Sequence, residues 1–344
     1  MFNEFNSIEN SYNTKIIKDI KNYGYDKEEW IVMEKIHGAN FSAITSGDAV
    51  CWAKRTSILT KDEKFYNHQR ATDDLIEPIK DLFHLIKKDY KNLDNIQVFG
   101  ELFGGIYNHI DIPKVQGCAQ VQSGIHYHPD IKFMIFDIRY KLKSEKPSKI
   151  KSLEEELDNL HIQKQSDIIH DLNYLDHDIL IKYVSKIPGL LYCKILKRGS
   201  FDELLSLKPY FQTTIPNIFG LPEIENNFAE GYVLKPTKNK FFKTNHRVIL
   251  KLKRDNLNEK IINSTTTKVE FNKNLIFGYL NESRLESVLS KLNDNERQCE
   301  KLVVEKLVDD AWIDIGKDYD INEFNIPEFS KAMRGYVKKF FKKN

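Results

Sequence analysis

The chain has 344 residues, enough for about two domains with sizeable cores, and its net charge of only +2 does not by itself require a nucleic-acid partner. Hydrophobic residues make up 41% and charged residues 30%, as in soluble globular proteins, and no apolar run approaches the length of a membrane span. The first thirteen residues are polar and Asn-rich, unlike a signal peptide. We therefore expect a cytoplasmic protein, of a cell or a virus-infected cell, with no membrane partner.

Two short strands near the start flank a lysine. Residues 30–33 and 41–45 are predicted as buried strands, with Lys35 after the first and Gly38 in the turn between them. A lysine fixed between a strand and a glycine turn can hold its amine against a ligand phosphate, as a covalent lysine nucleophile requires. The alternative is a surface lysine beside a hairpin, because Lys-x-x-Gly is common by chance.

A hairpin and a helix follow. Gly47 marks the turn into a strand over residues 49–53. Apolar residues then recur at helical spacing over residues 75–86, which predicts an amphipathic helix that begins near Asp73.

Two apolar strands carry candidate site residues. Residues 96–103 predict a strand with Glu101 near its end, where functional sites are often built. Residues 132–138 predict a central buried strand, in which the neighbours Phe136 and Asp137 should face opposite sides.

The middle of the chain is less regular. Residues 141–186 are rich in Lys, Asp and Leu at helical spacing, which predicts a helical insertion of unknown role. Ser200 and Glu203 form a predicted capping box for a short helix that ends at Leu207.

Residues 230–235 and 247–253 predict two strands that flank a basic turn. Lys251 and Lys253 share one face of the second strand. Residues 231–254 contain eight Lys or Arg and no Asp or Glu. Because both strands are otherwise apolar, two like charges on one face predict an anionic ligand, although an exposed strand face is an alternative.

Beyond about residue 256 the alternation stops. Residues 263–267 predict a linker, and helical periodicity follows over residues 285–292 and 329–340, with Pro327 in the first turn of the last helix. The final eleven residues add five Lys or Arg, a second basic zone suited to phosphate binding.

These patterns predict an α+β protein. We expect an antiparallel-sheet domain over residues 1–260 and a small all-helical domain over residues 261–344. The four cysteines have no Cys-x-x-Cys pair and are predicted to be buried free thiols without a structural zinc: Cys51, Cys118, Cys193 and Cys299.

Five motifs resemble those of the RNA ligase 2 family, the nick-sealing phage enzymes and trypanosome RNA-editing ligases among the covalent nucleotidyltransferases. In chain order they are residues 34–41 (Glu-Lys-Ile-His-Gly-Ala-Asn-Phe), 99–101 (Phe-Gly-Glu), 136–138 (Phe-Asp-Ile), 230–236 (Glu-Gly-Tyr-Val-Leu-Lys-Pro) and 251–253 (Lys-Leu-Lys). Each is weak alone, but five in this order are specific. DNA ligases and capping enzymes typically carry Asp where this chain has His37, and they continue into a β-barrel.

The resemblance implies that residues 1–260 are a nucleotidyltransferase (adenylyltransferase) domain and that residues 261–344 handle RNA. It implies an ATP-dependent RNA ligase that seals 3′-hydroxyl/5′-phosphate nicks in duplex RNA. It implies a lysyl-AMP on Lys35, an adenylylated RNA 5′ end, and Mg²⁺ or Mn²⁺ held by Glu230. The implied catalytic residues are Lys35, His37, Glu230, Lys251 and Lys253. The implied ATP or AMP contacts are Glu34, Lys35, Ile36, Asn40, Arg55, Glu101, Phe136, Glu230, Lys251 and Lys253. The implied RNA contacts are Ala39, where the family commonly has Thr, and Phe65 and Tyr66.

A lysine with an ordinary pKa of about 10.4 is protonated at neutral pH, so we expect Lys251 and Lys253 to lower the pKa of Lys35. We also expect a monomer. The alternatives are a GTP-dependent capping guanylyltransferase and a non-catalytic RNA-binding protein on a ligase scaffold. The presence of Lys35, Glu230, Lys251 and Lys253 argues against the second alternative.

Overall fold

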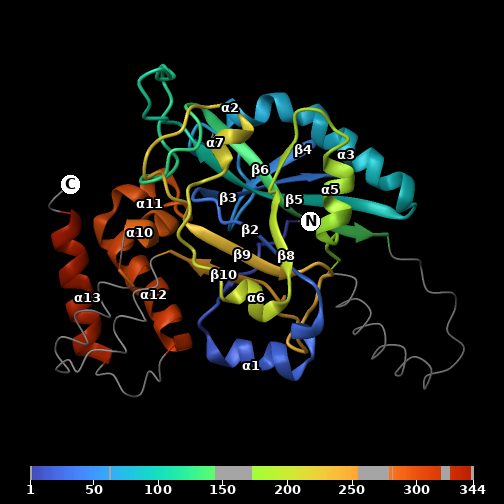
Figure 1. Ribbon diagram of the computed structural model, residues 1–344. Helices are drawn as coiled ribbons and strands as arrows, with labels where there is room; N and C mark the ends of the chain where they lie inside the picture. Colours follow the sequence, from blue (N-terminus) through green and yellow to red (C-terminus); the bar gives the residue numbers. More distant parts are fainter. Residues whose placement is uncertain are drawn as a thin grey trace, which may run out of the picture. The chain divides into compact units, whose positions relative to one another are not determined.

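The computed structural model describes residues 2–61, 63–143, 173–254, 279–280, 282–318 and 326–341 (Figure 1). The chain divides into two compact units, Met1–Glu9 with Lys18–Leu252 and Asn10–Ile17 with Lys253–Asn344. The predicted domain boundary after residue 260 lies outside the described residues.

The described strands form two five-stranded sheets, with the orders β1-β10-β9-β2-β8 and β4-β3-β5-β6-β7. The pairs of β2 with β8 and β9, of β3 with β4 and β5, and of β5 with β6 are antiparallel, whereas β6 and β7 are parallel. The strands are β1 (Glu9–Asn10), β2 (Trp30–Glu34), β3 (Ala39–Thr45), β4 (Val50–Lys54), β5 (Leu93–Gly104), β6 (Ile131–Leu142), β7 (Leu191–Tyr192), β8 (Ile195–Gly199), β9 (Gly231–Pro236) and β10 (Leu250–Lys253).

Helices accompany both sheets and make up the described C-terminal residues. They are α1 (Thr14–Asn22), α2 (Gln69–Thr72), α3 (Ile76–Asp89), α5 (His177–Val184), α6 (Phe201–Leu205), α7 (Ile215–Ile218), α10 (Glu282–Leu289), α11 (Asp294–Gln298), α12 (Glu300–Asp318) and α13 (Ile326–Phe341), with 3₁₀ turns η1 (Tyr25–Lys27) and η2 (Asp73–Leu75). This mixture confirms the predicted α+β class with its antiparallel sheets.

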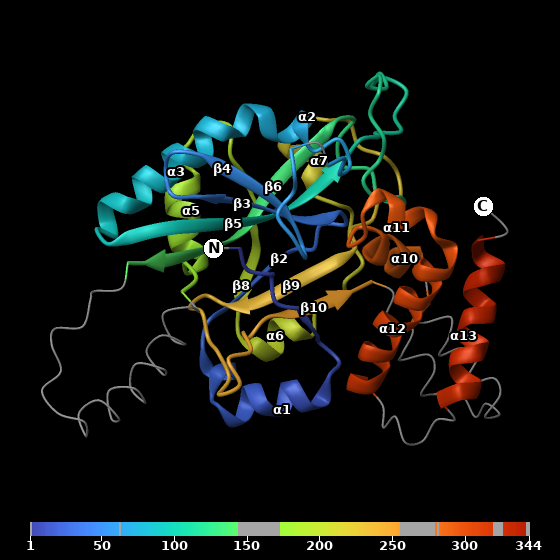
Figure 2. The ribbon, with the colours of Figure 1, turned by 180° about the vertical axis from the view of Figure 1, so that it is seen from behind.

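The segment around Lys35 connects the two sheets. β2 belongs to the first sheet and β3 to the second, so residues 35–38 cross from one to the other. The hairpin interpretation of this segment is therefore wrong, because β2 and β3 are not partners. Figure 2 shows both sheets from behind.

The outer face of the second sheet packs against α3 and α5. The predicted helix begins as η2 at Asp73 and continues as α3, which buries Ile79, Leu82 and Phe83. These side chains join the same core cluster as Phe41 of β3. The helical spacing read from the sequence is thus the core-facing stripe of α3.

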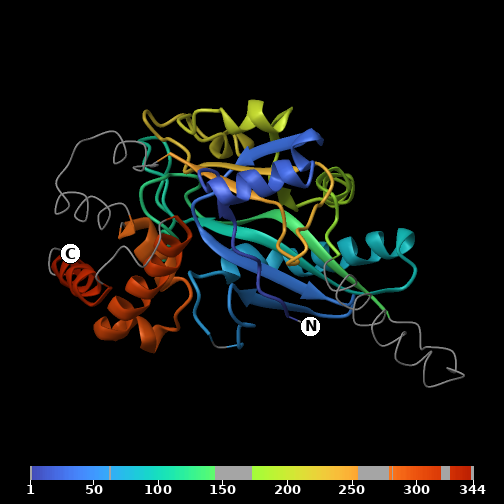
Figure 3. The same ribbon diagram turned by 90° about the horizontal axis from the view of Figure 1, so that it is seen from below.

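The first sheet packs against α6. Trp30 of β2 is fully buried, and its ring lies 4.7 Å from that of Phe201, centroid to centroid. Ser200 accepts a hydrogen bond from the Glu203 backbone at 3.4 Å, which is the Ser200 half of the predicted capping box, and the helix is shorter than predicted. Figure 3 views the molecule from below, the side on which α6 lies in Figure 1.

The described C-terminal residues are helical, as the periodicity predicts. Val288 of α10, Leu307 of α12 and Met333 of α13 belong to one buried cluster. Arg284 forms ion pairs with Asp310 at 2.7 Å and with Asp314 at 2.6 Å, which tie α10 to α12. Within the described ranges, no helix has the combination of length and apolarity that crossing a bilayer requires.

The prediction of four buried cysteines needs correction, and the predictions of a helical insertion and a linker fall mostly outside the described residues. Cys51 and Cys299 are exposed and Cys118 is partly buried, so of the four cysteines only Cys193 is buried as predicted. Cys51 is exposed because it lies on β4, an edge strand. Most of the predicted helical insertion and the predicted linker lie outside the described residues.

Candidate active site

The start of β9 holds both the backbone and the amine of Lys35. Lys35 N donates to Gly231 O at 2.9 Å, and its Nζ donates to Glu230 Oε2 at 2.7 Å. Glu34, the last residue of β2, lies opposite Tyr232 in the antiparallel register of β2 and β9. The first sheet therefore brings together a lysine and a glutamate that are 195 positions apart in the sequence.

Three further predicted residues surround this ion pair. His37 Nδ1 lies 3.5 Å from Glu230 Oε2. Glu101 on β5 and Arg55, which follows β4, lie close enough to Lys35 for their charges to affect its pKa. Both sheets thus contribute charged side chains to one partly buried cluster.

Gly38 allows the connecting segment to approach β5. A Cβ atom at this position would lie 2.2 Å from Leu102 O and 2.8 Å from Glu101 Cγ, so no larger residue fits without a shift. Gly38 has no positive φ, and its role is therefore close approach rather than the turn conformation predicted. Two residues later, Asn40 lies opposite Glu101 in the register of β3 and β5.

The charges around Lys35 set its protonation. Burial alone lowers the pKa of Lys35, but the carboxylates of Glu230 and Glu101 outweigh burial and raise it above the ordinary value. The predicted lowering is therefore wrong in direction. Burial raises the pKa of Glu101 to about 7, although Lys35 opposes this shift. Lys35 is an ammonium at neutral pH and has to lose a proton before it can act as a nucleophile.

Phe136 lies at a β-bulge. The register of β5 and β6 shifts immediately after the pair of Phe99 and Asp137 and skips Phe136. The ring of Phe5 packs on both Phe99 and Phe136, with centroid distances of 5.1 and 5.0 Å. Since paired residues share a face, Phe136 and Asp137 point to the same side. The predicted opposite orientation is wrong because a bulge interrupts the alternation.

Asp137 is the acid of a buried ion cluster. Both terminal guanidinium nitrogens of Arg247, Nη1 and Nη2, donate to its carboxylate, and Lys235 Nζ lies 3.3 Å from its Oδ1. All three side chains are buried. Lys235 Nζ also lies 3.5 Å from the backbone oxygen of Phe136, which links the cluster to the bulge. The sequence showed Arg247 only as part of a basic region, because its partner is 110 positions away.

Lys251 and Lys253 both lie on β10 and are partly buried. They alternate with buried Leu250 and Leu252, as the pattern predicts. Their action on a phosphate stays a prediction.

The structure treats the three predicted RNA contacts differently. Phe65 and Ala39 are each only 1% exposed, and the Phe65 ring stacks on Phe41 at 5.8 Å. Direct RNA contact through these two side chains is not supported, because the core covers them. Tyr66 is partly buried with a positive φ of 48°, and its role stays a prediction.

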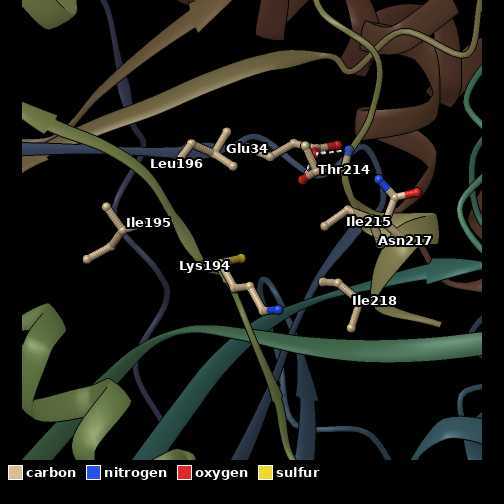
Figure 4. A pocket seen from close by; sticks show the side chains of 9 residues that line it. Glu34, Lys194, Ile195, Leu196, Thr214, Ile215, Asn217 and Ile218 are labelled. Atoms are coloured by element: carbon tan, nitrogen blue, oxygen red, sulfur yellow. Dashed lines mark hydrogen bonds between the residues drawn. The ribbon is translucent and has the colours of Figure 1, made fainter. Parts of the chain in front are cut away.

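Sequence reasoning missed the groups that hold the backbone beside Lys35. The Glu34 carboxylate accepts from the Thr213 hydroxyl. It also accepts from Thr214 N at 2.8 Å and from Thr214 Oγ1 at 2.7 Å (Figure 4). Burial raises the pKa of Glu34, and these bonds oppose that shift. The Tyr127 hydroxyl accepts from His37 N at 2.9 Å. No local pattern in the sequence indicates these pairs.

A cavity of about 320 Å³ lies beside Glu34 (Figure 4). Its walls come from the connection between β7 and β8, from β8 and from α7. The lining residues are Glu34, Cys193, Lys194, Ile195, Leu196, Thr214, Ile215, Asn217 and Ile218.

The residues near Lys35 fit a divalent cation that binds together with phosphates. In the part of the chain that the structure describes, no three His, Cys, Asp or Glu side chains cluster as a metal site. Glu230 and Glu101, however, place two carboxylates around Lys35. Carboxylate oxygens suit Mg²⁺, which usually takes one or two of them and completes its shell with water and phosphate oxygens.

Comparisons with known proteins identify the family. The RNA ligase family model matches residues 28–253. RNA-editing ligase 2, mitochondrial, of Trypanosoma brucei brucei is 28% identical over 384 residues, covering 95% of this chain and 86% of that protein. RNA-editing ligase 1, mitochondrial, of the same organism is 28% identical over 243 residues, covering 64% of this chain but only 47% of that protein.

A solved Naegleria gruberi RNA ligase variant with ATP and Mn aligns with a TM-score of 0.40 and 12% identity, covering 74% of this chain and 57% of that one. The family assignment does not depend on this structural alignment but on the RNA ligase family model. Since that model covers well over half of the chain, this protein belongs to the RNA ligase family, which confirms the resemblance and the enzyme class predicted from its motifs.

Proposed function

We propose that this protein is an ATP-dependent RNA ligase that seals 3′-hydroxyl/5′-phosphate nicks in duplex RNA through a lysyl-AMP. The observation that carries the proposal is the arrangement of Lys35, whose amine meets Glu230 and shares its surroundings with Glu101 and Arg55. The trypanosome relatives, both named RNA-editing ligases, support RNA as the substrate.

The reaction has three steps. First, Lys35 Nζ attacks the α-phosphorus of ATP, so that a P–N bond forms, the bond to the β-phosphate breaks and pyrophosphate leaves. Second, an oxygen of the RNA 5′-phosphate attacks the same phosphorus, which breaks the P–N bond and transfers AMP to the RNA. Third, the neighbouring 3′-hydroxyl attacks the 5′-phosphate, and AMP leaves as the new phosphodiester forms.

Glu230 has two roles in the first step. Its Oε2 lies 2.7 Å from the Lys35 amine, within reach of the proton that has to leave before attack. Its carboxylate, with Glu101 nearby, would also hold Mg²⁺ or Mn²⁺, which supplies positive charge beside the α-phosphate. Arg55 and His37 would donate hydrogen bonds to the phosphate oxygens.

The remaining nucleotide contacts follow the family resemblance. We propose that Glu101 accepts a hydrogen bond from the ribose, that Phe136 stacks on adenine, and that backbone groups of Glu34 and Ile36 read the adenine edge. The bulge at Phe136 supports this role, because bulges re-aim side chains next to functional sites. Asn40 lies opposite Glu101 and would join the phosphate contacts.

We assign RNA handling to the helical C-terminal residues. Arg334 and Lys338 are exposed on α13, where they would meet RNA phosphates. Tyr66 would help to position the RNA ends. We further propose a monomer that acts in the cytoplasm.

Lys251→Ala and Lys253→Ala are each expected to slow lysine adenylylation by on the order of 10²-fold, because each removes a cation from the transition-state charge at the α-phosphate. Single-turnover labelling with α-³²P-ATP measures this rate. Lys243→Ala removes an exposed lysine of the same basic region and should leave the rate unchanged. Normal labelling of both strand variants would show that these lysines do not act at the phosphate.

Nick sealing should require ribonucleotides on the 3′-hydroxyl side of the nick, because an A-form end and its 2′-hydroxyl distinguish RNA from DNA. Matched duplex nicks with RNA or DNA on that side, compared at two salt concentrations, test this proposal. RNA-ended nicks should be sealed and sealing should weaken with salt, since phosphate contacts release counterions. Equal sealing of all-DNA nicks would contradict an RNA ligase.

The labelling experiment also separates the alternatives. A capping guanylyltransferase would be labelled by GTP at least as well as by ATP. A non-catalytic RNA-binding protein would bind RNA but take no label from either nucleotide.

A further inference from the structure

Residues 35–38, which contain the proposed nucleophile, have no strand partner along their length. The backbone N–H of Lys35 bonds to Gly231 O, and that of His37 bonds to the Tyr127 hydroxyl. A nucleophile on such a connection depends on whatever fixes its backbone, because reactive geometry tolerates only small displacements.

Two buried contacts hold the ends of this connection. On one side, the Glu34 carboxylate takes three hydrogen bonds from Thr213 and Thr214. On the other, the Tyr127 hydroxyl takes the His37 N–H. Glu34 is 4% exposed and Tyr127 only 1%, so water is largely excluded from both contacts. The lysine therefore lies between two anchored positions.

One residue, Asn227, connects the two contacts through its side chain and its backbone oxygen. Asn227 Oδ1 accepts from His126 N at 2.9 Å, and its Nδ2 donates to His126 O at 2.6 Å. The backbone oxygen of Asn227 accepts from Thr213 N at 2.9 Å. Asn227, itself buried, thus ties the residue before Tyr127 to the segment that holds Glu34. We call this set of bonds the Asn227 bridge.

We propose that Tyr127 and Asn227 are positioning residues for Lys35, a role that rests on the proposed ligase function. They touch neither ATP nor RNA in this scheme. Tyr127 fixes the backbone two residues after the nucleophile. Asn227 holds the segment of Tyr127 and the segment that binds Glu34 in a fixed position relative to each other. Their loss should slow lysine adenylylation, the step in which the Lys35 amine must attack the α-phosphorus in line.

The protonation of Tyr127 suits this role. Burial raises the pKa of Tyr127 far above its ordinary value, and Glu34 among its neighbours adds to the shift. Its hydroxyl remains neutral at any working pH. The ring packs edge-on against Phe103 at 5.4 Å, a contact that phenylalanine would keep. Tyr127→Phe therefore removes the hydrogen bond and little else.

The experiment compares two reactions of the full chain. Lysine adenylylation by ATP uses Lys35 as the nucleophile, whereas sealing of a nick with a pre-adenylylated 5′ end bypasses it. For Tyr127→Phe we expect the adenylylation rate to fall about 10-fold, with the ATP concentration for half-maximal rate unchanged, because an unpaired buried N–H disturbs the backbone. Sealing of the pre-adenylylated nick should stay within about twofold of the unchanged protein.

Tyr183→Phe is the matched control. Tyr183 is a buried tyrosine on α5 whose hydroxyl bonds to Asp89, and its loss should alter neither reaction. Asn227→Asp keeps the Oδ1 acceptor but replaces the donor to His126 O, and it should show the selective loss seen with Tyr127→Phe.

The results separate this inference from the function on which it rests. Equal losses in both reactions, or no loss in adenylylation, would overturn the positioning role while leaving the ligase proposal intact. Absence of labelling in the unchanged protein would overturn the ligase proposal itself. A selective loss with both variants, but not with Tyr183→Phe, would establish the Asn227 bridge as the support of the nucleophile.

Discussion

Lys35→Ala should eliminate covalent labelling by ATP, because it removes the amine that lies 2.7 Å from Glu230 Oε2 and that we propose as the nucleophile. Loss of a covalent nucleophile lowers rates by on the order of 10⁶-fold, which places labelling below detection. The measurement is transfer of label from α-³²P-ATP to protein on a denaturing gel. Lys197→Ala removes an exposed lysine of β8 and should label normally.

Lys35→Arg makes the test sharper. Arginine keeps the positive charge that faces Glu230 and Glu101, so the net charge of the cluster is unchanged. Its guanidinium, however, does not lose a proton to become a nucleophile. It should therefore fold normally and remain unlabelled. Labelling of either Lys35 variant would show that another residue carries the AMP.

The labelling rate of the unchanged protein should rise with pH. Glu230 and Glu101 raise the pKa of Lys35, so the reactive amine is a small fraction at neutral pH and grows as pH increases. The logarithm of the single-turnover rate should climb by about one unit per pH unit until this pKa is reached. A rate that stays constant or falls as pH rises would show that deprotonation of Lys35 does not limit adenylylation.

Asp137→Ala should cost about 3–5 kcal/mol of folding free energy, because it leaves the buried charges of Arg247 and Lys235 without their acid. Asp137 is 1% exposed, and Arg247 and Lys235 are 3% and 2% exposed, so water cannot replace the lost partner. Urea unfolding followed by tryptophan fluorescence measures the change.

Asp178→Ala is the control for this effect. Asp178 also pairs with an arginine, Arg198, but their side chains are 52% and 38% exposed. Screening by water limits that loss to about 1 kcal/mol or less. Similar costs for both variants would mean that the Asp137 cluster contributes no more than a surface pair.

The Asp137 contribution should disappear in acid. Burial alone would raise the pKa of Asp137, but Arg247 and Lys235 outweigh burial and lower it. A lowered folded-state pKa gives stability that is present above the unfolded value of about 3.9 and is lost as pH falls through the folded value. The stability difference between the unchanged protein and Asp137→Ala should therefore shrink below about pH 4.

Local patterns in the sequence were sufficient to predict most strands and helices and the residues that carry the proposed chemistry. Short apolar runs predicted the buried strands β2 and β3, and helical spacing predicted α3, because a helix that buries one face repeats its apolar residues at that period. Lys35, Glu101 and Glu230 were indicated by five motifs in a specific order and by the resemblance of these motifs to the RNA ligase 2 family.

The contacts among these residues, by contrast, depend on the folded chain. Arg247 finds Asp137 across 110 positions, a partner that no local pattern encodes. A bulge turns Phe136 and Asp137 to one side, against the alternation of an ideal strand. The pKa of Lys35 rises because carboxylates from two distant strands surround it. Such contacts depend on which distant strands pair, whereas the local periodicity of the chain indicates only which face of a strand is buried.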